Sequence, residues 1–252
     1  MFQAGKINNA ISEMNRLEID IMGISEMRWR SNGQCSLENH KVYYSGNEEN
    51  QHIHGLGFIV SCEIQKYVIN FVPISERIAV IQLSGNPVNI NLVYAPTYDA
   101  DDVEIEQFYC TISDILKTFK KHEITIIIGD MNAKIGQGKS GDLIGDYGLG
   151  TRNERGERLM IFVEDEDLAV LKTFFKLPPR CLYTWRSPHD QPGDIVRNQI
   201  DYMFIKNRFR TSCLRVKTYP GADIESDHNP LVGSFRIRFK KSIKKQYKKN
   251  GT

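Results

Sequence analysis

Acidic residues and one histidine stand next to short apolar runs in this sequence, where α/β enzymes commonly carry catalytic side chains. Glu26 and Asp130 each follow such a run, and Asp201 lies within another. Asp227 and His228 come shortly before a final run. Strand ends that share one rim of a fold hold reactive groups on rigid supports. We therefore expect these five side chains to converge in space.

The spacing around two of the aspartates predicts polar side chains on one face of a strand. Alternate residues of an extended chain face the same way. Asp130 and Asn132 should then point together with Met131 turned away, and Asp201 should face opposite to Tyr202. An aspartate in a core strand is costly unless it is paired or bound to a metal. Mg²⁺ takes oxygen ligands and keeps room for waters and substrate phosphate, so this pattern suits a hydrated divalent cation.

Apolar periodicity predicts the elements that must position these side chains. Helical spacing favours helices at about residues 7–17, 103–121 and 154–166. Short β-rich runs separated by Gly, Asn and Pro favour strands. These runs are residues 19–24, 56–60, 67–71, 78–83, 88–93, 124–128, 168–171, 181–185, 199–205, 214–219 and 232–239. Many short strands with three helices indicate an α/β fold in which two sheets pack face to face between helices.

Composition and charge limit the protein class. The chain has 252 residues, of which 40% are hydrophobic and 25% charged, as in ordinary globular proteins. A net charge of +2 creates no overall field that demands a polyanionic partner. Residues 1–239 are expected to form one domain. Residues 240–252 carry six lysines and no acid, which predicts a basic disordered tail that could add nonspecific DNA affinity.

The cysteines and the absence of targeting signals limit the expected cellular location. Five dispersed cysteines argue against a disulfide framework or a zinc knuckle and favour a reducing compartment. No apolar run is long enough to span a bilayer, and no secretion signal is recognisable. We expect the nucleus or the cytoplasm, and no membrane partner. His52 and His54 form a His-x-His pair without a third ligand nearby, so no metal site is expected there.

Six segments in a fixed order carry a resemblance to one enzyme family. They are residues 23–29 (GISEMRW), 93–96 (VYAP), 129–133 (GDMNA), 183–185 (YTW), 199–202 (QIDY) and 226–230 (SDHNP). The sequence resembles the endonuclease/exonuclease/phosphatase family up to about residue 239. With residues 148–157 (GLGTRNERGE), it is most similar to the endonuclease domains of RTE-type non-LTR retrotransposons and the host proteins derived from them. The resemblance implies a four-layer α/β sandwich of two mainly antiparallel sheets flanked by helices.

The resemblance also implies a role for each matching side chain near the expected metal. Glu26 resembles the Mg²⁺-ligating glutamate, and Asp227 a second acidic residue beside the metal. Asp130 resembles the residue that activates the attacking water. Asn132 resembles the group that orients water and phosphate, and Tyr94 the tyrosine that contacts the scissile phosphate. Mg²⁺ is the implied cofactor, with Mn²⁺ as a possible substitute.

A histidine–aspartate pair completes the implied site. His228 resembles the catalytic histidine, and Asp201 the carboxylate that orients it. Independently of the resemblance, a histidine titrates near neutrality and can donate a proton or hydrogen bond to a phosphate. A partner carboxylate fixes its tautomer.

Four further residues are weaker candidates for substrate contact. They are Arg28, Thr184, Trp185 and Asn153. Trp185 is also a typical core residue. Asn153 is also a good cap for the helix expected from residue 154, and we favour this interpretation.

The resemblance implies a Mg²⁺-dependent, retrotransposon-derived endonuclease that nicks DNA and leaves a 3′-hydroxyl. Two alternatives stay open: a phosphatase or phosphodiesterase of the same family acting on RNA or small phosphoesters, and a catalytically weakened nucleic-acid- or chromatin-binding protein. The second alternative arises because family members carry a first core strand that ends in an asparagine. Met1 to Lys6 resemble the segment just after that strand. One interior strand place is therefore expected to be unfilled.

Overall fold

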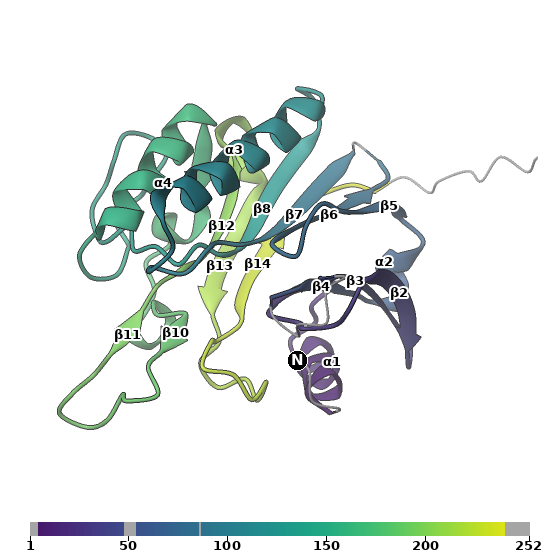
Figure 1. Ribbon diagram of the computed structural model, residues 1–252, viewed down its shortest axis with the longest axis horizontal. Coiled ribbons are helices and arrows are strands. Elements are labelled where there is room, and N and C mark those ends of the chain that lie inside the picture. Colours follow the sequence, from purple (N-terminus) through teal and green to yellow (C-terminus); the bar gives the residue numbers. More distant parts are fainter. Residues whose placement is uncertain (1–4, 48–53, 86, 240–252) are drawn as a thin grey trace, which may run out of the picture.

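Helices and sheets stack in four layers in the computed structural model, which describes residues 5–47, 54–85 and 87–239 (Figure 1). The layers are a helix pair, a six-stranded sheet, a four-stranded sheet and an N-terminal helix. The expected basic tail, residues 240–252, lies outside the described residues, as does His52.

The six-stranded sheet forms the centre of the fold. Its strands, in spatial order, are β5 (Val68–Pro73), β6 (Ile78–Leu83), β7 (Val88–Tyr94), β8 (Ile124–Asp130), β12 (Asp201–Lys206) and β9 (Leu168–Val170). The pair β7–β8 is parallel and the other neighbours are antiparallel. Ile126 packs toward the second sheet and Ile127 toward the helix pair, so β8 is buried on both faces. This explains its unbroken apolar run.

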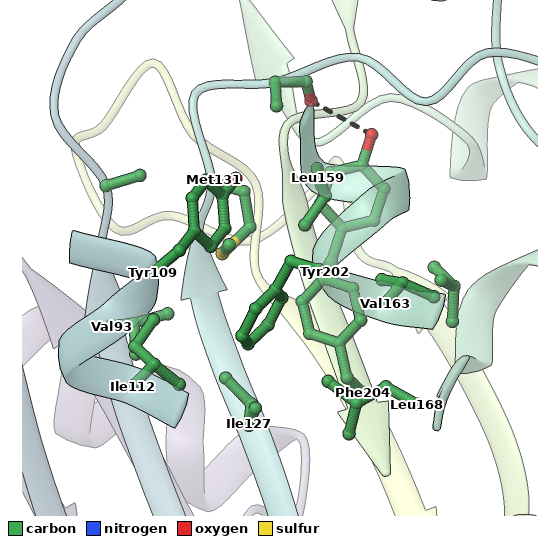
Figure 2. Close-up of a cluster of buried hydrophobic side chains, with 14 of the residues drawn as sticks. Val93, Tyr109, Ile112, Ile127, Met131, Leu159, Val163, Leu168, Tyr202 and Phe204 are labelled. Carbon is green, nitrogen blue, oxygen red and sulfur yellow. Dashed lines mark hydrogen bonds between the residues drawn. The ribbon is translucent and has the colours of Figure 1, made fainter. Parts of the chain in front are cut away.

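The helix pair α3 (Asp102–Thr118) and α4 (Glu154–Asp165) covers one face of this sheet (Figure 1). The side chain of Asp101 caps α3 by accepting a hydrogen bond from the backbone N–H of Glu104 at 2.8 Å. The apolar faces of both helices pack on the sheet in one cluster, with Tyr202 at its centre (Figure 2). This burial supplies most of the stabilisation of such amphipathic helices.

The other face of the central sheet packs against a four-stranded sheet. Its strands, in order, are β1 (Ile21–Ser25), β4 (Leu56–Val60), β3 (His40–Ser45) and β2 (Asn32–Leu37). Helix α1 (Lys6–Arg16) covers its outer side through Ile7, Ile11 and Met14. The short helix α2 (Cys62–Gln65) follows β4.

A hairpin of β13 (Cys213–Thr218) and β14 (Leu231–Phe235) stands apart from the four-stranded sheet. Among the described strands β1 pairs with β4 alone. The paired side chains Ile128 and Met203 are only partly buried although they lie in the central sheet.

The remaining elements are short. They are the two-stranded ladder of β10 (Trp185–Arg186) and β11 (Arg197–Asn198), and the 3₁₀ turns η1 (Leu171–Phe174), η2 (Pro179–Cys181) and η3 (Asn207–Ser212). The β10–β11 ladder projects from the body of the fold (Figure 1).

The mixed α/β fold with sheets flanked by helices is confirmed, and several strand predictions need correction. The strand predicted over residues 181–185 is wrong except at Trp185, where β10 begins, because Pro179 has no backbone N–H and opens the 3₁₀ turn η2. Strand β8 includes the predicted apolar run 124–128 and ends at Asp130. Strands β2 and β3 were not predicted. Strand β2 is polar and half-exposed, so its apolar pattern is weak.

The helices of the described residues are short or carry polar faces. None within residues 5–47, 54–85 and 87–239 combines the length and the apolar character needed to cross a bilayer.

Candidate active site

Two aspartates face each other at one rim of the central sheet. Asp130 ends β8 and Asp201 begins β12, and the antiparallel register pairs them directly. Asp130 is only 4% exposed. On the other side of β8, Gly129 allows close approach to β7, because a Cβ at its position, with φ of +147°, would collide with the carbonyl of Val93. The predicted alternation is also present, since Tyr202 packs on the helix side of the sheet.

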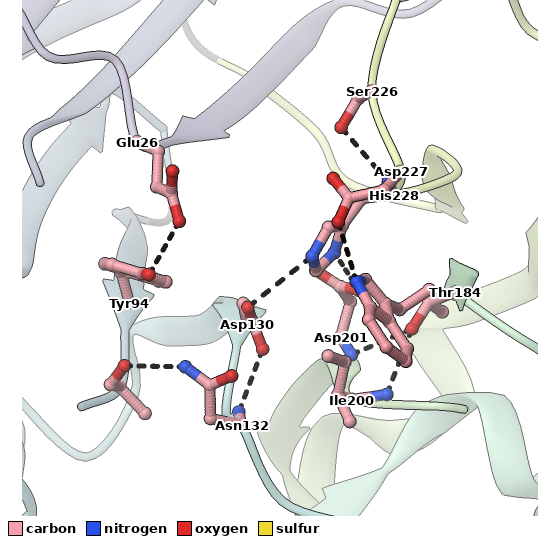
Figure 3. A network of polar contacts seen from close by, with 12 residues as sticks. Glu26, Tyr94, Asp130, Asn132, Thr184, Ile200, Asp201, Ser226, Asp227 and His228 are labelled. Carbon is pink, nitrogen blue, oxygen red and sulfur yellow. Dashed lines mark hydrogen bonds and ion pairs between the residues drawn. The ribbon is translucent and has the colours of Figure 1, made fainter. Parts of the chain in front are cut away.

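His228 bridges these two carboxylates (Figure 3). Its Nδ1 lies 2.9 Å from Oδ2 of Asp201 and donates a hydrogen bond to it. Its Nε2 lies 3.9 Å from Oδ2 of Asp130. The backbone N–H of His228 donates to Oγ of Ser226 at 3.1 Å. The geometry thus has a carboxylate that orients the imidazole and a second carboxylate near its other nitrogen.

The proximity of these groups shifts their proton affinities. Burial and the charge of Asp201 raise the pKa of Asp130 well above its usual range. Burial by itself lowers the pKa of His228, but the charges of Asp201, Asp130 and Asp227 outweigh it and raise that pKa to about 10. A buried site with displaced pKa values is typical of acid–base chemistry.

Glu26 and Tyr94 lie on the opposite side of the site (Figure 3). The Tyr94 hydroxyl donates to Oε1 of Glu26 at 2.7 Å, and Arg28 donates to Oε2 at 2.6 Å. Burial alone would raise the pKa of Glu26, but these two hydrogen bonds hold it below its usual value. Burial and the neighbouring Glu26 raise the pKa of Tyr94. Glu26 is therefore ionised and Tyr94 neutral near pH 7.

Asn132 lies between these two sides. Its backbone N–H donates to Oδ1 of Asp130 at 2.8 Å, and its Nδ2 donates to the carbonyl of Ala95 at 2.9 Å. The extended chain does not persist after β8, because Asn132 has a left-handed φ of +46°. Asparagine tolerates this conformation through local hydrogen bonds.

Asp227 and the segment before β10 complete the rim. Asp227 is exposed, and its Oδ2 accepts a hydrogen bond from Nε1 of Trp185 at 2.8 Å. Thr184 is fully buried, and its Oγ1 accepts the backbone N–H groups of Ile200 and Asp201, each at 3.0 Å. The Thr184 hydroxyl therefore holds the start of β12, and burial keeps it from a substrate.

One protein-family model matches most of the sequence. The profile of the Endonuclease/Exonuclease/phosphatase family matches residues 4–228. The chain belongs to this family. The match includes every site residue described above.

Two curated proteins are similar to the chain in sequence. Craniofacial development protein 2 of Tragulus javanicus and of Bos taurus are each 37% identical to the chain over 238 residues. The alignments cover 94% of this chain and 41% and 39% of these relatives. The chain therefore spans about two fifths of their length. The family match and these relatives confirm the sequence-based resemblance.

Solved structures share the fold at low identity. The endonuclease domain of TRAS1, a telomere-specific non-LTR retrotransposon, superimposes with a TM-score of 0.65 at 16% identity and 94% coverage of both chains. The AP endonuclease LMAP from Leishmania major gives a TM-score of 0.69 at 12% identity, covering 93% of this chain and 84% of that one. The 3′ phosphatase NExo from Neisseria, bound to a product DNA hairpin, gives 0.66 at 13% identity, covering 92% and 95%. At these identities the likeness shows the fold alone.

Three side chains of the site have the spacing of metal ligands. One possible ligand atom from each of Asp130, Asp201 and His228 lies within 4.8 Å of the others. Glu26 and Asp227, the predicted metal ligands, are not members of this group within the described residues. Their carboxylates border the same region from two sides (Figure 3).

Two further predicted substrate contacts, Arg28 and Asn153, lie in different places. Arg28 reaches the site through its ion pair with Glu26. Asn153 makes its hydrogen bonds elsewhere, since its Oδ1 caps α4 at Gly156 N–H and also accepts from the N–H of Lys134, both at 2.9 Å. The favoured capping interpretation of Asn153 is confirmed.

Sequence reasoning missed two neighbours of Tyr94. The guanidinium of Arg77 lies 5.4 Å from the centre of the Tyr94 ring, and the ring of His54 lies 5.9 Å from it. Arg77 and His54 also contact each other at 3.4 Å. Both lie outside helices and strands, and only the folded chain brings them beside Tyr94.

Proposed function

We propose that this chain is a divalent-metal-dependent hydrolase that cuts phosphodiester bonds of DNA. The observation that carries the proposal is the His228 imidazole held by Asp201 with Asp130 at its other nitrogen. Across the site stands an ionised Glu26 that Tyr94 and Arg28 hold in place. Phosphodiester hydrolysis needs this combination of a proton acceptor, a proton donor and a cation site.

The donor set suits a hard cation. Glu26 and Asp227 offer carboxylate oxygens, the ligands that Mg²⁺ prefers, and the rim leaves Asp227 exposed. We assign these two residues to Mg²⁺, with Mn²⁺ as a substitute. When bound, the cation relieves negative charge on the phosphate oxygens and on the leaving oxygen.

The protein groups carry the proton transfers. Asp130 accepts a proton from the attacking water, a role that its raised pKa suits. His228, fixed through Nδ1, donates from Nε2 toward a phosphate oxygen. Asn132 orients the water, because its amide is anchored on Ala95. Tyr94 faces the phosphate beside Glu26.

Several observations support DNA as the substrate. The TRAS1 domain of the same fold is described as an endonuclease domain of a retrotransposon, and NExo is described bound to a DNA hairpin. We therefore infer nicking that leaves a 3′-hydroxyl, an origin in a retrotransposon, and a nuclear location. NExo is also described as a 3′ phosphatase. This favours a second candidate, a phosphatase or phosphodiesterase on RNA or small phosphoesters.

One assay distinguishes these candidates. Supercoiled plasmid is incubated with the purified chain in Mg²⁺, in Mn²⁺ and in EDTA, beside His228→Gln and the exposed control His189→Gln. Metal-dependent relaxed circles from the wild type and from His189→Gln, but not from His228→Gln, support the proposal. Phosphate release from small esters without nicking supports the second candidate. Binding of DNA with no cleavage in either metal supports a nucleic-acid-binding protein with a weakened site.

A further inference from the structure

A lysine is completely buried behind the candidate active site. Lys172 lies in η1, directly after β9, and has no exposed surface. Its Nζ donates hydrogen bonds to the carbonyl of Leu182 and to Oγ1 of Thr218. Thr218 is also fully buried. Lys172 thus joins η1 to two chain segments that are far apart in the sequence.

Both of these segments lead into the site. Leu182 precedes Thr184 by two residues, and the Thr184 hydroxyl holds the backbone N–H of Asp201 at 3.0 Å. Thr218 ends β13 and pairs with Leu231 of β14, three residues after His228.

A hydrogen bond joins the two segments. The backbone N–H of Asn229 donates to the carbonyl of Thr184 at 2.7 Å. A continuous series of contacts therefore runs from Lys172 to the Asp201–His228 pair through each of the two segments.

A lysine in this place is costly for folding. An ammonium group carries three N–H donors and no acceptor, and its removal from water is unfavourable. Burial lowers the pKa of Lys172 to about 7, although the charges of Asp201 and Cys181 act in the other direction. A methionine would fill similar space without this desolvation. The amine is therefore not explained by a gain in stability. It is explained by the two oriented hydrogen bonds that it makes.

We propose that Lys172 is a positioning residue, which holds Leu182 and Thr218 so that Asp201 and His228 meet in reactive geometry. The inference rests on the proposed hydrolase function. It assigns no contact with substrate to Lys172. Displacement of a catalytic group by about 1 Å can cost about 100-fold in rate, so a support behind the site affects turnover more than substrate binding.

The test compares Lys172→Met with a matched control, Lys206→Met. Lys206 is partly buried, its Nζ donates a hydrogen bond to the carbonyl of Glu166 at 2.6 Å and pairs with the Glu166 carboxylate, and it lies at the far end of β12 from Asp201. We expect Lys172→Met to lower kcat for plasmid nicking by about 10- to 100-fold with KM changed by less than about twofold. Lys206→Met should keep the wild-type kcat. Equal kcat values for the two folded variants would overturn the proposal.

A second readout does not depend on activity. Amide hydrogen exchange by NMR reports the Asp201 and Asn229 N–H groups, which Thr184 holds. Lys172→Met should speed exchange at these two amides by about tenfold or more relative to amides in the middle of β8. A uniform change across the chain would indicate a structural role only. If the wild type nicks no DNA, the proposed function fails and this readout still decides the role of Lys172.

Thr218→Val covers the case in which Lys172→Met does not fold. Valine keeps the shape of threonine and removes only the hydroxyl that Lys172 uses. We expect a smaller fall in kcat with the same unchanged KM and the same local gain in exchange at Asn229. Wild-type kcat and exchange in a folded Thr218→Val protein would also count against the proposal.

Discussion

Asp130 and Asp201 occupy directly opposed positions on two antiparallel strands, and His228 contacts both carboxylates. This pairing places the charge of Asp201 beside the buried Asp130, and burial together with that charge raises the pKa of Asp130. The pair is therefore a source of reactivity and a cost to stability.

Replacement of Asp130 by asparagine separates these two effects. We expect Asp130→Asn to lower the nicking rate by about 10²–10⁴-fold, the range of a positioned acid or base. The free energy of unfolding should stay equal or increase, because a buried carboxylate is removed. Nicking kinetics and urea unfolding measure the two quantities. Asp142→Asn, an exposed control, should change neither, and wild-type-like nicking by Asp130→Asn would remove Asp130 from the mechanism.

Glu26 is the residue whose loss should change metal dependence. Its carboxylate is ionised near neutral pH and lies between Tyr94 and Arg28. We expect Glu26→Gln to raise the Mg²⁺ concentration for half-maximal nicking by about tenfold or more, because one anionic ligand is lost. Titration of the rate with Mg²⁺ measures this shift. The exposed control Glu18→Gln should follow the wild-type curve, and an unshifted curve for Glu26→Gln would contradict the assignment.

Local patterns predict the parts of this site that depend on neighbours in sequence. The apolar run before Asp130 predicts a buried strand, and the alternation around Asp201 predicts which side chains face the helices. The family resemblance places His228 beside Asp201, and the 2.9 Å hydrogen bond agrees with it. The proposed chemical roles of these residues stay predictions.

Contacts between distant segments are what the sequence does not reveal. Lys172 stands in an apolar stretch as an ordinary charged residue, and only folding brings Thr218 and Leu182 to it. Thr184 is one of several threonines, and its hydroxyl gains importance because the start of β12 lies against it. Strand β2 alternates only between exposed and half-buried positions, so its apolar signal is weak.

The buried Lys172 and the partly buried His228 give opposite contributions to the pH dependence of the free energy of unfolding. The pKa of Lys172 falls from 10.5 to about 7 on folding, so between these values the unfolded chain binds more protons and stability rises with pH. The pKa of His228 rises from 6.5 to about 10, so its stabilisation is complete below pH 6.5 and is lost as the pH approaches 10. In the wild type the two trends oppose each other.

Single variants should reveal each trend. In EDTA, we expect the free energy of unfolding of Lys172→Met to fall relative to the wild type as the pH rises from 7 to 10. That of His228→Gln should rise over the same interval, each by on the order of a few kcal/mol. Urea unfolding at several pH values measures both. Lys206→Met serves as the control that follows the wild type, and parallel curves for all four proteins would refute the assigned pKa directions.

The hydroxyl of Tyr202 links the core to the loop that follows β8. This fully buried group donates to the carbonyl of Gln199 at 2.7 Å and accepts the backbone N–H of Ile135 at 3.2 Å. Tyr202→Phe keeps the ring in its cluster (Figure 2) and leaves these backbone groups without that partner. We expect a loss of about 1–3 kcal/mol in the free energy of unfolding, with the denaturant m-value unchanged.

The measurement is urea unfolding of Tyr202→Phe beside Tyr98→Phe, whose side chain is 57% exposed. Tyr98→Phe should unfold with the wild-type midpoint, because water solvates an exposed hydroxyl equally well in both states. A wild-type midpoint for Tyr202→Phe as well would mean that its hydrogen bonds add no net stability. A loss confined to Tyr202→Phe would show that the backbone after β8, which carries Asn132, is held from within the core.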